Sequence, residues 1–169
     1  MSFNDDDLNE MLIDCVSDIK RLNYELFPIL SIKFTKGSKK SMAYIRRDKN
    51  CSYNLDTMRF ENVAYHIRVH GMFKQLQEND YNDLKSVVMH EVIHAIDLSK
   101  ISDKYWFPAL LHGSKYNEIK NEVEQTYGYK HIHDTSMETN ELNKMDIFFK
   151  NYYESRGIKF QKGVLRNII

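Results

Sequence analysis

One segment limits the possible folds more than any other: residues 82–99 show the strongly amphipathic pattern of an α-helix. Apolar side chains recur there at helical spacing along one stripe, and they are Leu84, Val88, Val92, Ala95 and Ile96. Asp80 or Asn82 can cap the amino terminus of this helix. Because such a stripe has to be buried against other elements, we predict a helix at the centre of the domain.

Two kinds of pattern surround this helix, and together they indicate the α+β class. Helical spacing is found over residues 5–25, 58–78, 114–127 and 138–155. Alternating or short apolar segments, typical of strands, are found over residues 29–36, 42–46 and 52–55. We therefore predict a small antiparallel sheet packed on helices, in a single domain over residues 1–155 with a basic C-terminal tail over residues 156–169.

Charge and cysteine content exclude several classes of protein. The 169 residues include 24 Lys and Arg and 24 Asp and Glu, so the formal charge is zero, whereas general nucleic-acid-coating proteins carry a large basic excess. The two cysteines exclude a disulfide framework and a four-cysteine zinc ribbon.

Neither a secretory signal nor an apolar run of membrane-spanning length is visible, so we expect no membrane partner and a cytoplasmic location. The abundance of Lys, Asn and Ile is typical of an AT-rich genome, such as that of a phage, for which the location would be the host cytoplasm.

The predicted central helix carries His90-Glu91-Val92-Ile93-His94, an H-E-x-x-H motif. At about 100° per residue, His90 and His94 lie about 40° apart around the helix and one turn apart along it. Both imidazoles can therefore bind one Zn²⁺ from the same face. Glu91 lies beside that face, where it can accept a proton from a water molecule on the metal. The simpler alternative is a pair of surface histidines with a solvated glutamate.

A catalytic zinc site needs a third protein ligand, and three residues are candidates. Asp97 follows His94 too closely on the same helix to reach around the ion. Glu118 lies on the next predicted helix, as in zincins that use a glutamate ligand. His112 stands just before that helix and is followed by Gly113, which lets the chain turn tightly beside the metal. Because imidazole is the commonest metal ligand, His112 is favoured, and the other two stay open.

Two motifs in this order resemble the SprT-like (Spartan-type) zinc metalloprotease family. The first is His90-Glu91-Val92-Ile93-His94-Ala95, and the second is His112-Gly113-Ser114-Lys115-Tyr116, which opens the next helix. The resemblance covers residues 25–135 and implies a zincin-like fold, with His90, His94 and His112 as ligands of one Zn²⁺ and Glu91 as the general base. It also implies cleavage of peptide bonds and, in the Spartan branch, of proteins crosslinked to DNA. The chain departs from the family in having no cysteine after Cys51, which excludes the downstream zinc ribbon of many members.

We therefore predict a zinc-dependent metalloendopeptidase that cleaves protein or peptide substrates. Two alternatives remain: a zinc-containing binding or structural module without activity, and a glutamate-ligand zincin that uses Glu118. The candidates for stabilising the oxyanion, or for orienting a metal ligand, are Tyr116, His131 and His133. A substrate strand could pair with a sheet edge near residues 52–55, because extended peptides add to exposed edges.

Basic residues gather between positions 33 and 49, where seven Lys and Arg stand against one Asp. On the predicted β-hairpin they could contact phosphate groups, so DNA is a candidate partner. The residues expected to make these contacts are Lys39, Lys40, Arg46 and Arg47. A solvated hairpin surface is the commoner explanation for such a cluster.

Two further features are expected to be structural. His66 and His70 form a second pair four residues apart, for which we predict two surface histidines on a helix rather than a second metal site. Trp106 is predicted to be a packed hydrophobic anchor rather than a lid over substrate, because aromatic side chains mostly serve burial.

Overall fold

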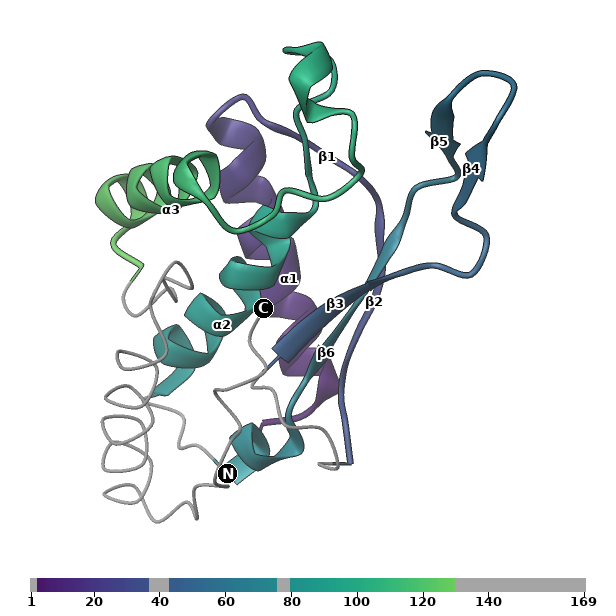
Figure 1. Cartoon of the computed structure of the whole chain (residues 1–169). Coiled ribbons are helices and arrows are strands. Elements are labelled where there is room, and N and C mark those ends of the chain that lie inside the picture. Colours follow the sequence, from purple (N-terminus) through teal and green to yellow (C-terminus); the bar gives the residue numbers. More distant parts are fainter. Residues whose placement is uncertain (1–2, 37–42, 76–79, 130–169) are drawn as a thin grey trace, which may run out of the picture.

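Three α-helices and seven short strands form the part of the chain that the computed structural model describes, residues 3–36, 43–75 and 80–129 (Figure 1). The predicted α+β class is therefore confirmed. Several predicted features lie outside the described residues: the helix over residues 138–155, the tail over residues 156–169, His131, His133, Lys39 and Lys40.

Helix α1 (Asp5–Arg21) begins where the sequence predicts. Asn4 caps it, because its side-chain oxygen accepts a hydrogen bond from the Asp7 N–H while the Asp7 carboxylate accepts one from the Asn4 N–H. One stripe of the helix is buried, and its apolar members are Leu8, Met11, Cys15 and Ile19. The helix ends at Arg21 rather than at residue 25, and the chain enters strand β1 (Glu25–Leu26).

Helix α2 (Tyr81–His94) is the predicted central helix, and every residue from Val88 to its end is buried. It stops at His94 rather than at residue 99, because the next residues form strand β7 (Ile96–Asp97), which pairs antiparallel with β1. Helix α3 (Ser114–Tyr127) has the predicted bounds. It ends at Gly128, whose φ of 73° lies in the left-handed region that glycine adopts at helix ends.

The main sheet is mixed, which corrects the prediction of an antiparallel one. Its strands lie in the order β2 (Ile29–Phe34), β6 (Tyr65–Val69) and β3 (Ala43–Arg47). Strand β6 runs parallel to β2 and antiparallel to β3. Because β6 separates β2 from β3, the basic residues between positions 33 and 49 do not form the predicted hairpin.

The predicted helix over residues 58–78 is also wrong. Strand β5 (Arg59–Glu61), strand β6 and a 3₁₀ helix (Gly71–Gln75) occupy this segment. Burial alternates along β6, with Tyr65, Ile67 and Val69 facing the core. The apolar residues of this segment fit a helical period almost as well as an alternating one, and only their pairing with two neighbouring strands decides between the two.

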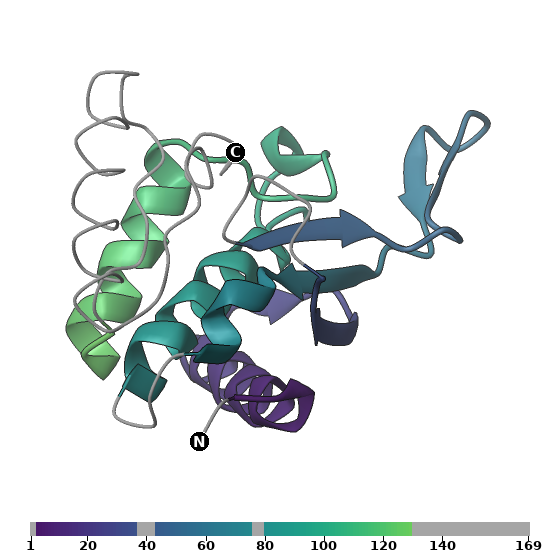
Figure 2. The same cartoon turned by 90° about the horizontal axis from the view of Figure 1, so that it is seen from below.

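The described elements form two layers and an extension. Helices α1 and α2 cover one face of the main sheet, and α3 packs beside α2 away from the sheet (Figures 1 and 2). Strand β4 (Ser52–Asn54) and β5 form a hairpin that stands away from the body beyond the end of β3 (Figures 1 and 2). None of the described helices is both long and apolar enough to cross a lipid bilayer.

Candidate metal centre

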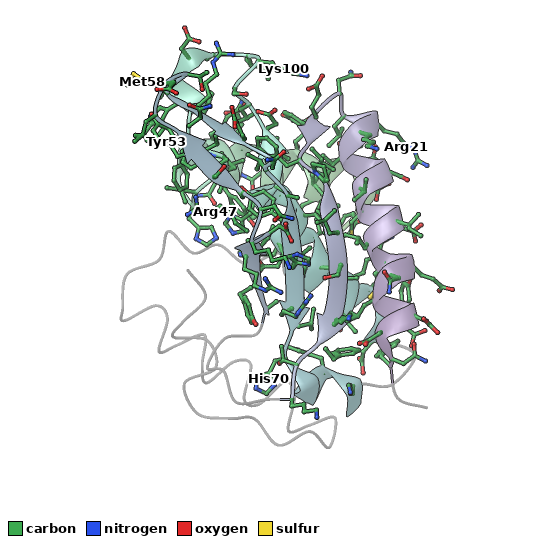
Figure 3. The ribbon with its side chains drawn as sticks, turned by 90° about the vertical axis from the view of Figure 1, so that its right-hand side faces the viewer. Arg21, Arg47, Tyr53, Met58, His70 and Lys100 are labelled. Atoms are coloured by element: carbon green, nitrogen blue, oxygen red, sulfur yellow. The ribbon has the colours of Figure 1, made fainter. Side chains whose placement is uncertain are left out.

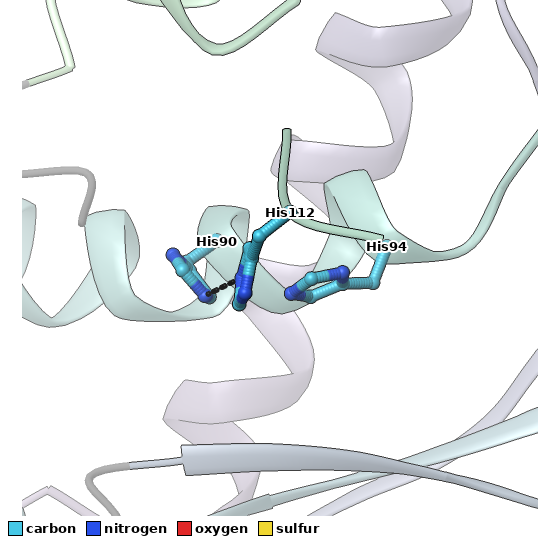
Figure 4. Close-up of side chains that lie close together, drawn as sticks. All are labelled: His90, His94 and His112. Carbon is cyan, nitrogen blue, oxygen red and sulfur yellow. Dashed lines mark hydrogen bonds between the residues drawn. The ribbon is translucent and has the colours of Figure 1, made fainter. Parts of the chain in front are cut away.

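Three imidazoles converge from two elements of the fold. His90 and His94 project from consecutive turns of α2, and His112 lies in the loop just before α3 (Figure 4). One nitrogen from each ring lies within 4.8 Å of the others, and the Nε2 atoms of His90 and His112 are 3.2 Å apart. In a tetrahedral site with Zn–N bonds of 2.0–2.1 Å, two ligand nitrogens lie about 3.4 Å apart. The three histidines could therefore hold one metal ion.

His94 is oriented by the loop that carries His112. Its Nδ1 atom lies 2.6 Å from the backbone oxygen of Leu110, and the Leu110 N–H donates to the backbone oxygen of His94 over 3.0 Å. A carbonyl oxygen can only accept, so Nδ1 of the neutral ring carries the proton and Nε2 keeps its lone pair for a metal. Burial, together with the neighbouring His112, lowers the pKa of His94 to about 4. The imidazole is therefore neutral at pH 7, as a metal ligand must be.

Tyr116 joins α3 to α2, the helix that carries His90 and His94. Its hydroxyl donates a 2.7 Å hydrogen bond to the backbone oxygen of His90, and its side chain is fully buried. The centre of its ring lies 5.4, 4.8 and 4.9 Å from the ring centres of His90, His94 and His112. Of the two roles predicted for Tyr116, this geometry favours the orientation of the ligands, because the hydroxyl proton is already donated to α2.

Glu91 lies within the same buried turn of α2, and its side chain is 4% exposed. Burial raises the pKa of its carboxyl group from 4.5 to about 8. Without a cation nearby, this group holds its proton at neutral pH, whereas a divalent cation would favour the carboxylate. A buried carboxyl group on the helix that carries two of the three imidazoles suits a metal site with an acid–base residue.

The other two candidates for the third ligand lie elsewhere. The Glu118 side chain is 66% exposed, and its carboxylate pairs with Lys115 on the surface of α3. Asp97 belongs to β7, and its carboxylate accepts hydrogen bonds from the N–H and the hydroxyl of Ser99. Among the described residues, the structure brings His112 to the pair on α2 and leaves Glu118 and Asp97 outside the group.

His66 and His70 are not the predicted pair of surface histidines on a helix. His66 lies in β6, where its ring nitrogens are 2.6 Å from the Ser31 hydroxyl and 2.6 Å from the Asp48 carboxylate. The hydrogen bond with His66 lowers the pKa of Asp48. His70 is buried just after the strand. Four residues of extended chain span about 13 Å, so a spacing that brings two imidazoles together on a helix separates them here.

The two described arginines of the basic cluster point to opposite sides of the sheet. Arg46 pairs across the strands with His66, on the face of the sheet away from the helices. Lys33 of β2 and Arg68 of β6 form another cross-strand pair on the same face. Arg47 follows on the other side, and its guanidinium lies 5.7 and 5.6 Å from the ring centres of Phe60 and Phe107. Among the described residues of the sequence cluster, Lys33 and Arg46 therefore share one face of the sheet, to which β6 adds Arg68 from outside the segment 33–49.

Sequence reasoning missed one group at this centre, the backbone oxygen of Leu110. No side-chain pattern could have indicated it, because every residue carries the same carbonyl group. Comparison of the chain with protein-family models, with curated proteins and with solved structures gives no match. The geometry of the three histidines and Glu91 therefore carries the functional assignment.

Proposed function

We propose that this protein is a zinc-dependent metalloendopeptidase with a zincin-like fold, similar to the SprT-like proteases. One observation carries the proposal: three imidazoles from α2 and the following loop converge on one point, with the buried Glu91 carboxyl group on the same turn of α2 as His90. Imidazole nitrogens suit zinc well, and three protein ligands leave the fourth position that a catalytic zinc requires.

His90, His94 and His112 would hold the ion. When bound, zinc would polarise the carbonyl group of the cleaved bond and lower the pKa of a water molecule. A Glu91 carboxylate oxygen accepts the proton of the attacking water and then passes it to the nitrogen of the leaving amine. The Leu110 oxygen holds His94 in the tautomer that presents Nε2, and the Tyr116 hydroxyl holds the backbone of α2 at His90.

The edge of β3 offers a place for the substrate chain. In the described part of the chain, β3 pairs with β6 on one side only. It packs against α2, the helix that carries His90 and His94, and is the strand that follows the grey segment in Figure 4. An extended peptide that added to this edge would pass the metal centre, so β3 replaces residues 52–55 as the proposed position of the substrate.

Turnover and metal content together test the proposed function. We expect the zinc-loaded full chain to cleave unfolded casein, and Glu91→Gln to lose activity by about 100-fold or more while retaining one zinc per chain. Glu118→Gln, which changes an exposed carboxylate in the same way, should cleave casein like the wild type. Equal turnover by the wild type and Glu91→Gln would refute proteolysis by this site. Stoichiometric zinc without any turnover would identify the binding module instead.

A nucleic acid is a second proposed partner, because Lys33, Arg46 and Arg68 share the face of the sheet away from the helices. Three cations on one face can contact the phosphates of a DNA backbone. Binding of a DNA duplex should weaken with salt and should be lost when the three are replaced by glutamine. Arg47→Gln is the matched control, because that side chain lies on the other side of the strand. The absence of binding at low salt would refute this partner.

A further inference from the structure

Four aromatic side chains gather at the surface beyond the end of β3. Tyr53 and Phe60 come from the β4–β5 hairpin, and Trp106 and Phe107 come from the segment between α2 and α3. We call these four residues, together with Arg47, the aromatic cradle. Trp106 is 66% exposed and Tyr53 is 39% exposed, so the prediction that Trp106 is a packed anchor is wrong. Contiguous exposed apolar surface of this kind marks a site of interaction.

The rings of the cradle hold one another in place. Phe60 lies at the centre, with ring-centre distances of 5.0 Å to Tyr53, 6.3 Å to Trp106 and 5.9 Å to Phe107. The Trp106 and Phe60 planes are 21° apart and therefore stacked, while the Arg47 guanidinium covers Phe60 and Phe107. These contacts already order the rings. The free energy of ligand binding would therefore not have to offset the entropic cost of ordering them.

A cavity of about 510 Å³ adjoins the rings. Its apolar lining includes Phe27, Met58, Val63 and Pro108, in addition to rings of the cradle. The charged residues around it are balanced in sign, with Arg59 and Lys100 against Asp97 and Asp103. A large uncharged side chain, such as that of phenylalanine or leucine, suits a cavity that is lined mainly by apolar side chains and carries no excess charge.

The cradle is connected to the metal centre by two routes along the chain. Arg47 is the last residue of β3, the strand that packs against α2. Arg47, Tyr53 and Met58 follow one another from there to the tip of the hairpin (Figure 3). On the other side, the segment from Phe107 reaches Leu110, which binds His94, and then His112. Phe107 also lines a second cavity of about 280 Å³, together with Leu111 and Gly113 on either side of His112 in the chain.

We propose that the aromatic cradle binds a large apolar side chain of the polypeptide substrate, on the amino-terminal side of the cleaved bond. This inference rests on the proposed peptidase function. Strand β3 packs against α2 and ends at Arg47 in the cradle, and a peptide that pairs antiparallel with it runs in the opposite direction. Antiparallel pairing is the more stable arrangement for an added strand. The residues of the substrate that precede the cleaved bond therefore reach the cradle.

Cleavage of matched peptides tests the side and the chemistry. A single phenylalanine is placed at successive positions before and after the cleaved bond in otherwise polar peptides. We expect kcat/KM to be about tenfold higher with phenylalanine before the bond than with alanine there. Trp106→Ala should remove most of this preference, so that it slows the phenylalanine peptide much more than the alanine peptide. Ile101→Ala is the matched control, because this side chain is equally exposed on the same segment but lines neither cavity. A preference after the bond, or equal loss for both peptides, would overturn the proposal.

A binding measurement separates failure of the cradle from failure of the peptidase. Trp106 is the single tryptophan of the chain, so its fluorescence reports directly on the cradle. In zinc-loaded Glu91→Gln, the phenylalanine peptide should shift this emission to the blue, and Phe60→Ala should weaken the binding about tenfold. If the emission shifts but the wild type cleaves nothing, the cradle binds peptide and the proposed peptidase is wrong. If the emission does not shift, the cradle is refuted whether or not cleavage occurs.

Discussion

Replacing Glu91 with glutamine should stabilise the metal-free protein at neutral pH. The carboxyl group is buried, and its pKa is about 8 in the folded protein against 4.5 for the exposed group. At pH 7 the unfolded chain releases this proton while the folded chain largely keeps it. The difference between the two pKa values therefore lowers the free energy of unfolding by about 3 kcal/mol at that pH. Glutamine has nearly the same shape and does not titrate, so it removes this cost.

The direction of the pKa shift sets the pH dependence of the effect. Below pH 4.5, Glu91 is protonated in both states and costs nothing. As the pH rises from 4.5 to about 8, only the unfolded chain loses the proton, so the free energy of unfolding falls, by about 5 kcal/mol once both states are ionised. The burial that raises the pKa of Glu91 therefore destabilises the metal-free fold.

Urea denaturation in EDTA, repeated between pH 5 and pH 8.5, measures this difference. We expect Glu91→Gln to exceed the wild type by less than about 1 kcal/mol at pH 5 and by about 3 kcal/mol at pH 7. Saturating zinc should close the gap, because a cation favours the carboxylate. A difference that does not change with pH, or a glutamine variant that is less stable throughout, would refute the buried carboxyl group as its cause.

Three further substitutions test the site and the fold. His112→Ala should lose the zinc that the wild type retains on dialysis, whereas Glu118→Ala should keep it; metal analysis giving the opposite result would establish a glutamate ligand. Tyr116→Phe removes the buried hydroxyl that bonds to the His90 backbone and should lower the free energy of unfolding by about 1–3 kcal/mol, so an unchanged urea midpoint would contradict the role inferred for that bond. Gly128→Ala forces a Cβ atom into the left-handed conformation at the end of α3 and should cost about 1 kcal/mol, which thermal denaturation would detect.

The helices could be predicted because their signals are local. Asn4 and the acidic first turn mark the start of α1, and Gly128 marks the end of α3. The order of the strands could not be predicted in this way. Residues 65–69 pair with β2 on one side and β3 on the other, and this insertion depends on contacts between segments that lie far apart in the sequence.

The same division applies to the candidate site. A spacing of four residues places His90 and His94 on one face of any helix, so these two positions follow from the sequence and from helical geometry. His112 was favoured over Glu118 by ligand chemistry and by the resemblance to a family, and the structure places His112 in the group. The role of Leu110 depends on a backbone carbonyl, for which a sequence has no pattern. Tyr116 was a candidate from the sequence, but only the direction of its hydroxyl decides between its two predicted roles.

By itself, then, the sequence determined helices α1, α2 and α3, the α+β class and the pair of imidazoles on one helix, since each depends on the chemistry of residues a few positions apart. Only the tertiary structure decided the mixed sheet, the burial that shifts the pKa of Glu91, the separation of Arg46 from Arg47 and the exposure of Trp106. These properties depend on what surrounds each side chain in space. A periodic pattern shows that a side chain can be buried, but only the packed fold decides whether it is.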